Sequence, residues 1–113
     1  MSFLSRLMGG GDALAPADFL AQRDPSAPVL DVRTPAEFAQ GHLADAVNVD
    51  VMAPDFPERA AALDLPANGP IYLYCRSGQR SATATKALRS MGHAGAVNVG
   101  GFDALARAGA ETA

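Results

Sequence analysis

The stretch of the sequence that decides the fold is Ile71-Tyr72-Leu73-Tyr74-Cys75-Arg76-Ser77-Gly78-Gln79-Arg80-Ser81. Its first five residues are apolar, aromatic or β-branched, which is typical of a buried strand. A helical pattern begins at Arg80-Ser81-Ala82, and one face of that helix is expected to carry Ala84, Ala87, Leu88 and Met91. Gly92 follows, where a left-handed helix cap is expected. The single cysteine of the chain is therefore predicted to lie between the end of a strand and a helix N-terminus.

This position favours a reactive thiol. A helix N-terminus presents unpaired N–H groups and the positive end of a dipole, and Gly78 allows the tight loop that such a cradle needs. Arg76 and Arg80 add two permanent charges. A lone cysteine is otherwise most often a small buried hydrophobe chosen for packing. The polar run directly after Cys75 is unsuited to a packed core, so we interpret Cys75 as a nucleophile.

Three motifs carry a family resemblance. Cys75 to Ser81 resembles the active-site loop of the rhodanese (thiosulfate sulfurtransferase) superfamily. Leu30-Asp31-Val32-Arg33-Thr34-Pro35-Ala36-Glu37-Phe38, continued by Gly41-His42-Leu43, and the later Asn98-Val99-Gly100-Gly101-Phe102 resemble two further motifs of that family in the right order. The resemblance implies an α/β three-layer fold, with helices on both faces of a parallel sheet of about five strands in the order 1-5-4-2-3.

The same resemblance implies sulfur transfer through a Cys75 persulfide, from thiosulfate or a similar donor to cyanide or a thiol acceptor. Cys75 is then the catalytic residue, and the expected substrate-binding residues are Arg76, Ser77, Gly78, Gln79, Arg80 and Ser81. Asp31 and Arg33 are expected to support the loop from the neighbouring strand, although the residues alone indicate an ordinary ion pair or turn at a strand end. We expect no cofactor, because the cysteine itself carries the sulfur, and no metal-ligand spacing is present.

Other functions stay open at this point. The first alternative is a persulfide relay that acts with a protein partner, and the second is a docking module without catalysis. The third is a cysteine-dependent phosphatase or arsenate reductase. Against the third, Cys75 and Arg80 form a C-x4-R loop, whereas the related phosphatases have one residue more and a wider cradle.

The rest of the chain alternates strands with helices, which predicts parallel βα units. Besides 71–75, strands are expected at 29–32, 46–49 and 96–99, and helices at 16–22, after Thr34, within 58–63 and over 102–108. Asp12 to Ala15 is a poor strand sequence, so the formation of the first edge strand stays open. Gly100-Gly101 indicates either a tight turn or a close approach to the active loop. Glu37 is interpreted as a helix cap, and His42 as a hydrogen-bonded structural residue.

Composition bounds the remaining possibilities. The 113 residues predict one domain over 12–113 behind a flexible tail over 1–11. A net charge of −3 argues against a nucleic-acid partner. No run is apolar enough for a membrane span, and a single cysteine suits the reduced cytoplasm. The family resemblance, by contrast, implies the expected partners: a small sulfur donor and a thiophilic acceptor, with a protein acceptor as an alternative.

Overall fold

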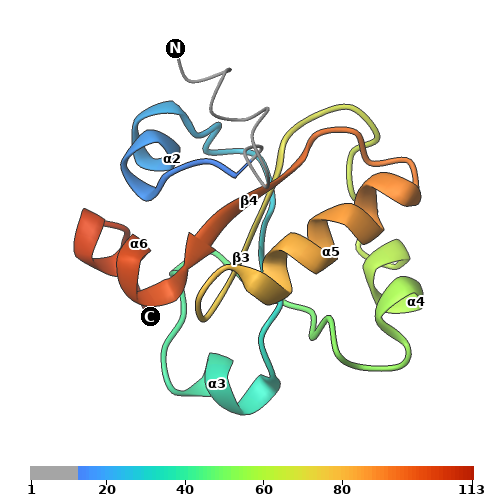
Figure 1. The fold of residues 1–113 in the computed structure, drawn as a ribbon, viewed down its shortest axis with the longest axis horizontal. Helices are drawn as coiled ribbons and strands as arrows, with labels where there is room; N and C mark the ends of the chain where they lie inside the picture. The colour runs from blue at the N-terminus through green and yellow to red at the C-terminus, as the bar shows by residue number, and fades with distance from the viewer. Residues whose placement is uncertain (1–12) are drawn as a thin grey trace.

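The computed structural model describes residues 13–113, and the predicted tail over 1–11 lies outside them. The described chain alternates helices and strands (Figure 1). The helices are α2 (Pro16–Gln22), α3 (Pro35–Ala39), α4 (Phe56–Ala61), α5 (Gln79–Ser90) and α6 (Phe102–Ala108). The strands are β1 (Val29–Asp31), β2 (Val47–Asn48), β3 (Ile71–Cys75) and β4 (Ala96–Gly101). No helix of the described residues is long and apolar enough to cross a membrane.

The four strands form one parallel sheet in the order β2-β1-β3-β4. This agrees with the order that the family resemblance implies, except that the sheet of the described residues has four strands and not five. The first edge strand is absent at residues 13–15, where a single backbone hydrogen bond from Leu14 N–H to Asn98 O (2.8 Å) stands in its place. The weak strand propensity of the segment accounts for this difference.

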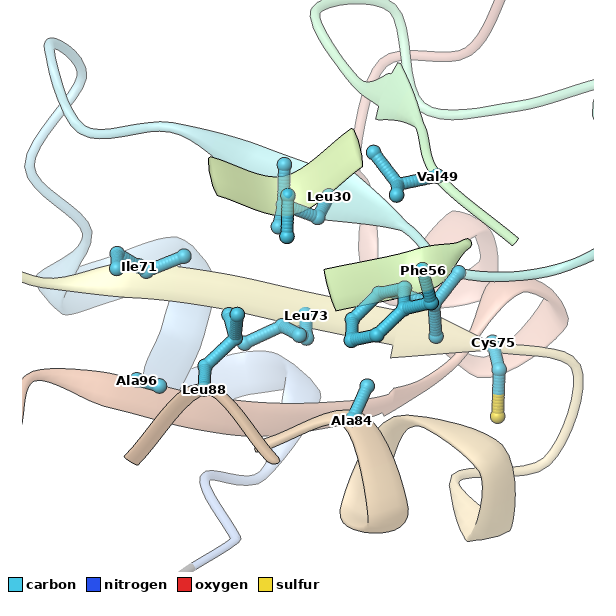
Figure 2. Packing of buried hydrophobic residues seen from close by; sticks show 11 residues of the cluster. Leu30, Val49, Phe56, Ile71, Leu73, Cys75, Ala84, Leu88 and Ala96 are labelled. Carbon is cyan, nitrogen blue, oxygen red and sulfur yellow. The ribbon is translucent and has the colours of Figure 1, made fainter. Parts of the chain in front are cut away.

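Side chains of β3 alternate between two apolar clusters. Ile71, Leu73 and Cys75 belong to the first cluster, which includes residues of α4 and α5 and is drawn in Figure 2. Tyr72 and Tyr74 belong to the second cluster, with residues of α2 and α6. Figure 1 shows these helix pairs on opposite sides of the sheet. The central strand is therefore buried on both faces, as a parallel sheet requires.

Most predicted boundaries are confirmed to within two residues. α2 and α6 begin and end as predicted, while α4 begins at Phe56, two residues before the predicted segment. α5 begins one residue early, and Met91 lies past its end and is exposed, so it is not part of the buried face. Of the two alternatives left open for Gly100-Gly101, the tight turn is wrong, because both residues are in β4.

Candidate active site

Cys75 ends β3, and its sulfur lies at the N-terminus of α5. The Gly78 N–H donates to Cys75 Sγ at 3.0 Å, and the Ser81 hydroxyl lies 3.4 Å from the same atom. Backbone N–H groups of Ser81 and Ser77 also contribute hydrogen bonds to the thiol. The side chain is buried at the end of the apolar row along β3 (Figure 2). The Cys75 side chain is thus part of the buried core, but its sulfur faces hydrogen-bond donors of the loop and of α5.

The sulfur takes the place of a helix cap. The N-cap residue of α5 is Gly78, with φ of 102°, and no side chain caps this helix from that position. Side-chain acceptors at an N-cap normally bind the N–H of the third helical residue, which here is Ser81. Cys75 Sγ receives that N–H instead. The free donors of the helix end are therefore directed at the one thiol of the chain.

The hydrogen bonds dominate the ionisation of this thiol. Burial raises the pKa of Cys75, but the Ser81 hydroxyl and the N–H groups of Ser81, Gly78 and Ser77 outweigh it, so the pKa lies below its ordinary value. Since the thiolate is the nucleophilic form of cysteine, the site favours the reactive state.

Strand β4 packs closely against the loop that follows Cys75. Cys75 is paired with Gly101 in the sheet, after a shift of register. A Cβ atom at Gly101 would lie 2.3 Å from Arg76 O, so only glycine fits here. This confirms the alternative of a close backbone approach at Gly101. Next to it, the Asn98 side chain binds both Ser81 and Gly78.

A cavity of about 230 Å³ opens beside the loop. It is lined by Arg33, Glu37, Gln40, Gly41, Arg76, Phe102 and Asp103. Arg76 is exposed, and no ion pair or hydrogen bond joins its side chain to another described residue. The cavity therefore offers one arginine directly after Cys75 whose charge is available to an anionic ligand.

Arg80 is engaged elsewhere. Its guanidinium binds both carboxylate oxygens of Glu37, at 2.8 and 2.9 Å. Glu37 also completes the predicted capping box with Thr34 at the start of α3. The capping prediction is confirmed, but Glu37 is more than a cap, because it ties α3 to the N-terminus of α5. Arg80 accordingly braces the loop.

Asp31 and Arg33 form a buried ion pair at the end of β1. Arg33 donates to both oxygens of Asp31, with the shortest contact at 2.6 Å, and also to Gly41 O. The Tyr74 hydroxyl donates to Asp31 at 2.7 Å. Burial, together with Asp31, raises the pKa of Tyr74, so this hydroxyl stays protonated. The ion pair that the residues alone indicate is confirmed, and it holds one wall of the cavity.

His42 is a structural residue, as expected. Its Nδ1 lies 2.9 Å from Phe38 O, and its ring stacks on Phe38 with 3.7 Å between ring centres. Within residues 13–113, no three side chains of His, Cys, Asp or Glu are grouped so that they could hold a metal ion.

The loop residues named from the sequence differ in what they contact. Gly78 contacts the sulfur through its backbone N–H and Ser81 through its hydroxyl, while Arg76 lines the cavity and Gln79 is exposed. Sequence reasoning gave no role to Asn98, Tyr74 or Phe102. A signal for Asn98 existed, since it opens the third motif of the family resemblance, just before the two glycines that could approach the active loop.

Comparisons with known proteins identify the family and the fold of this chain. Residues 15–108 match the Rhodanese-like domain. Thiosulfate sulfurtransferase 16, chloroplastic, of Arabidopsis thaliana is 40% identical, over 74% of this chain and 77% of the relative. Thiosulfate sulfurtransferase PspE of Escherichia coli is 31% identical, over 68% of this chain and 72% of the relative.

Solved structures share the fold. A rhodanese-related protein of Thermoplasma volcanium has a TM-score of 0.74 at 25% identity, over 89% of this chain and 96% of its own. A structure described as rhodanese with anions, from E. coli, has a TM-score of 0.67 at 26% identity, over 78% of this chain and 98% of its own. With the family match spanning most of the sequence, this chain belongs to the rhodanese-like domain family.

Proposed function

We propose that this protein is a sulfurtransferase that moves a sulfane sulfur from thiosulfate, or a similar anionic donor, to a thiophilic acceptor. The observation that carries the proposal is the position of Cys75, the single thiol, as the acceptor of N–H and hydroxyl hydrogen bonds at the N-terminus of α5. Relatives named thiosulfate sulfurtransferase support the donor class.

The reaction uses the thiolate twice. Cys75 Sγ attacks the outer sulfur of thiosulfate and forms a new S–S bond, while the S–S bond of thiosulfate breaks and sulfite leaves with its electron pair. The acceptor, cyanide or a thiolate, then attacks the terminal sulfur of the Cys75 persulfide, and the Cys75 thiolate is restored. The atoms and electrons balance without a cofactor. Gly78, Ser81 and the other loop donors stabilise the thiolate, and the N–H groups of the same loop stabilise the persulfide anion, whose charge lies on the terminal sulfur one bond beyond Sγ.

Arg76 binds the donor in this proposal. Its exposed guanidinium lines the cavity next to Cys75 and matches the sulfonate end of thiosulfate in charge and shape. The relative described as rhodanese with anions supports anion binding by such a domain. Arg80 contributes by holding the loop through Glu37.

Phosphate hydrolysis is a poorer match. The sequence offers two candidate acids for a leaving alcohol, Asp31 and Asp103. Asp103 lines the cavity, but Asp31 is fully buried and bound by Arg33 and Tyr74. Arg80, which would complete a phosphate cradle in the C-x4-R loop, is bound to Glu37.

A protein acceptor and a cytoplasmic location stay predictions of the sequence.

The deciding experiment treats the pure protein with thiosulfate and measures its intact mass. We expect the mass of one added sulfur, its removal by cyanide and the formation of thiocyanate. Cys75→Ser should take up no sulfur and turn over no thiosulfate. Cys75-dependent hydrolysis of an aryl phosphate without any thiocyanate would move the chain to the phosphatase alternative.

A further inference from the structure

Asn98 connects three parts of the site without touching the sulfur. Its Oδ1 accepts hydrogen bonds from the Ser81 hydroxyl (2.7 Å) and from Gly100 N–H (3.0 Å). Its Nδ2 donates to Gly78 O at 3.0 Å. Gly100 N–H can only donate and Gly78 O can only accept, so the amide is held in one orientation. The side chain is buried, which makes these bonds costly to lose.

Ser81 carries one hydroxyl hydrogen and faces two acceptors. Asn98 Oδ1 lies 2.7 Å from Ser81 Oγ, and Cys75 Sγ lies 3.4 Å from it. With a neutral thiol, the hydrogen belongs to Asn98, and the Cys75 S–H can donate to Ser81 Oγ. With a thiolate, the charged sulfur is the stronger acceptor, and the hydroxyl turns toward it. Asn98 Oδ1 then keeps the Gly100 N–H, so no buried acceptor is left without a donor.

Gly78 is held in a similar way. Its N–H donates to Cys75 Sγ, and its carbonyl accepts both the Ala82 N–H of α5 and the Asn98 amide. Gly78 has a φ of 102°, and a glycine changes between such a conformation and one with negative φ at little cost. The Asn98 contact therefore fixes the peptide on one side of the residue that supplies the shortest donor to the sulfur.

We propose that Asn98 is a positioning residue of the sulfur-transfer reaction, which fixes the Gly78 peptide so that the Gly78 N–H is directed at the Cys75 thiolate, while its Oδ1 competes with the sulfur for the Ser81 hydrogen. This rests on the proposed function only in taking Cys75 as the nucleophile. Asn98 acts through Ser81 and Gly78 and has no contact with the reacting atoms.

The charged groups around Cys75 come from several elements. They are Arg76 in the loop, Arg80 on α5 with Glu37 of α3 and Asp50 near it, the Asp31–Arg33 pair after β1, and Asp103 of α6 in the cavity wall. None of these side chains is hydrogen-bonded to Asn98 among the described contacts. A change at Asn98 therefore leaves the ionic surroundings of the thiol in place and alters its neutral donors.

The test measures the pKa of Cys75, from thiolate absorbance and from the pH dependence of alkylation by iodoacetamide. Because the chain has one cysteine, both signals report this residue alone. In a Ser81→Ala background, where only the Gly78 contact of Asn98 is left, Asn98→Ala should raise the pKa by about one unit, which is about tenfold less thiolate well below it. With Ser81 in place, Asn98→Asp should also raise the pKa, because a carboxylate retains the Ser81 hydrogen and adds a like charge.

Asn48→Ala is the matched control. Asn48 ends β2 and also donates from its amide to two backbone carbonyls, those of Asp31 and Arg33, at 3.0 and 2.9 Å. Its loss should leave the Cys75 pKa unchanged. With Ser81 in place, Asn98→Ala should raise the pKa by less than it does in the Ser81→Ala background, because the Ser81 hydroxyl is then free to donate to the thiolate. Sulfur transfer by Asn98→Ala should approach the wild-type rate at alkaline pH.

A folded Ser81→Ala/Asn98→Ala protein with the same Cys75 pKa as Ser81→Ala would overturn the proposal, and so would an equal shift in Asn48→Ala. Should Asn98→Asp fail to fold, as judged by circular dichroism, Asn98→Ser is measured in its place with the same two outcomes. These readouts need no sulfur donor. They are therefore separate from a failure of the proposed function, in which the wild-type protein itself would form no thiocyanate.

Discussion

Strands β1 and β3 are neighbours in the sheet and end at the same edge, but they end in opposite ways. At the end of β1, the Asp31 carboxylate meets a full positive charge, the guanidinium of Arg33, and both side chains are buried. At the end of β3, Cys75 Sγ meets the neutral donors of Gly78 and Ser81. The first arrangement satisfies a charge completely and holds it in place. The second stabilises a thiolate with dipoles and leaves it able to form a bond.

The buried pair at β1 also shapes the wall of the cavity. Arg33 lies over the Phe102 ring at 4.7 Å and over the Tyr74 ring at 5.6 Å, and it donates to Gly41 O at 2.7 Å. Phe102 begins α6 directly after the β4 residue that is paired with Cys75. The rigid end of β1 thus determines where the cavity lies relative to the reactive end of β3.

The largest effect on stability is expected when the β1 end is broken. Asp31→Ala leaves the Arg33 charge buried without its partner and the Tyr74 hydroxyl without its acceptor, which should cost about 3–5 kcal/mol of unfolding free energy. Asp45→Ala is the control, since Asp45 also binds an arginine, Arg23, at 2.6 Å, but is half exposed. It should cost no more than about 1 kcal/mol. Urea unfolding of both variants checks this, and equal losses of unfolding free energy in Asp31→Ala and Asp45→Ala would contradict the prediction.

The two ends also differ in how far the sequence predicted them. The β3 end was predictable, because a buried strand, a glycine loop and an amphipathic helix are all local patterns, and they placed Cys75 correctly. Arg33 and Asp31 are two residues apart, so their pairing was predictable as well. The partners Tyr74 and Phe102 were not, because they depend on which strands become neighbours in the sheet.

The same limit explains the errors. Arg80 and Glu37 are 43 positions apart, and no local pattern indicates that a capping glutamate would also bind the loop arginine. Gly100-Gly101 left two alternatives open, because glycine pairs form turns and also allow a close backbone approach. The approach of Arg76 O to Gly101, which makes glycine necessary inside β4, arises only when the loop and the strand pack together.

The next effect concerns donor binding at the β3 end. Arg76→Ala should raise the Michaelis constant for thiosulfate by about 10- to 100-fold, as expected when a charge-assisted hydrogen bond worth about 1.5–3 kcal/mol is lost. The melting temperature should hardly change, because the side chain is exposed. Arg76→Lys should restore only part of the binding, since it lacks the planar fork. Arg107→Ala, an exposed arginine of α6, serves as the control. Unchanged kinetics with a large loss of stability would make Arg76 structural.

A smaller effect tests the packing of β4 on the loop. Gly101→Ala places a methyl group against Arg76 O, and we expect a cost of about 1–3 kcal/mol, together with slower alkylation of Cys75 as the loop is displaced. Gly92→Ala is the control, because Gly92 has a φ of 102° with no atom within 4 Å of the added group. Gly92→Ala should lose a comparable amount of unfolding free energy, because alanine is strained at this φ. Its Cys75 should react at the wild-type rate, and slower alkylation in both variants would assign the effect to general destabilisation.

The smallest effect comes from the Glu37–Arg80 pair, which lies between the two extremes because both side chains are a quarter exposed. The hydrogen bonds from Arg80 lower the pKa of Glu37, and burial opposes them. The hydrogen bonds from Thr34 lower the pKa further, and the result is a pKa of about 2. The unfolded chain has the ordinary pKa of about 4.3, so it takes up the proton first as the pH falls. The stabilisation by this carboxylate is therefore complete above about pH 5 and is lost as the pH approaches about 2.

Glu37→Gln should lower the unfolding free energy by about 1 kcal/mol at neutral pH, the range of a solvent-screened pair, and the difference from the wild type should vanish in acid. Glu58→Gln is a close control, because Glu58 is also the third residue of a short helix with a proline in its first turn, but it is exposed. Urea unfolding of the three proteins across the acid range checks this. A difference between Glu37→Gln and the wild type that is independent of pH would show that the amide loses the geometry of the cap, and that the charge of Glu37 does not hold α3 to the loop.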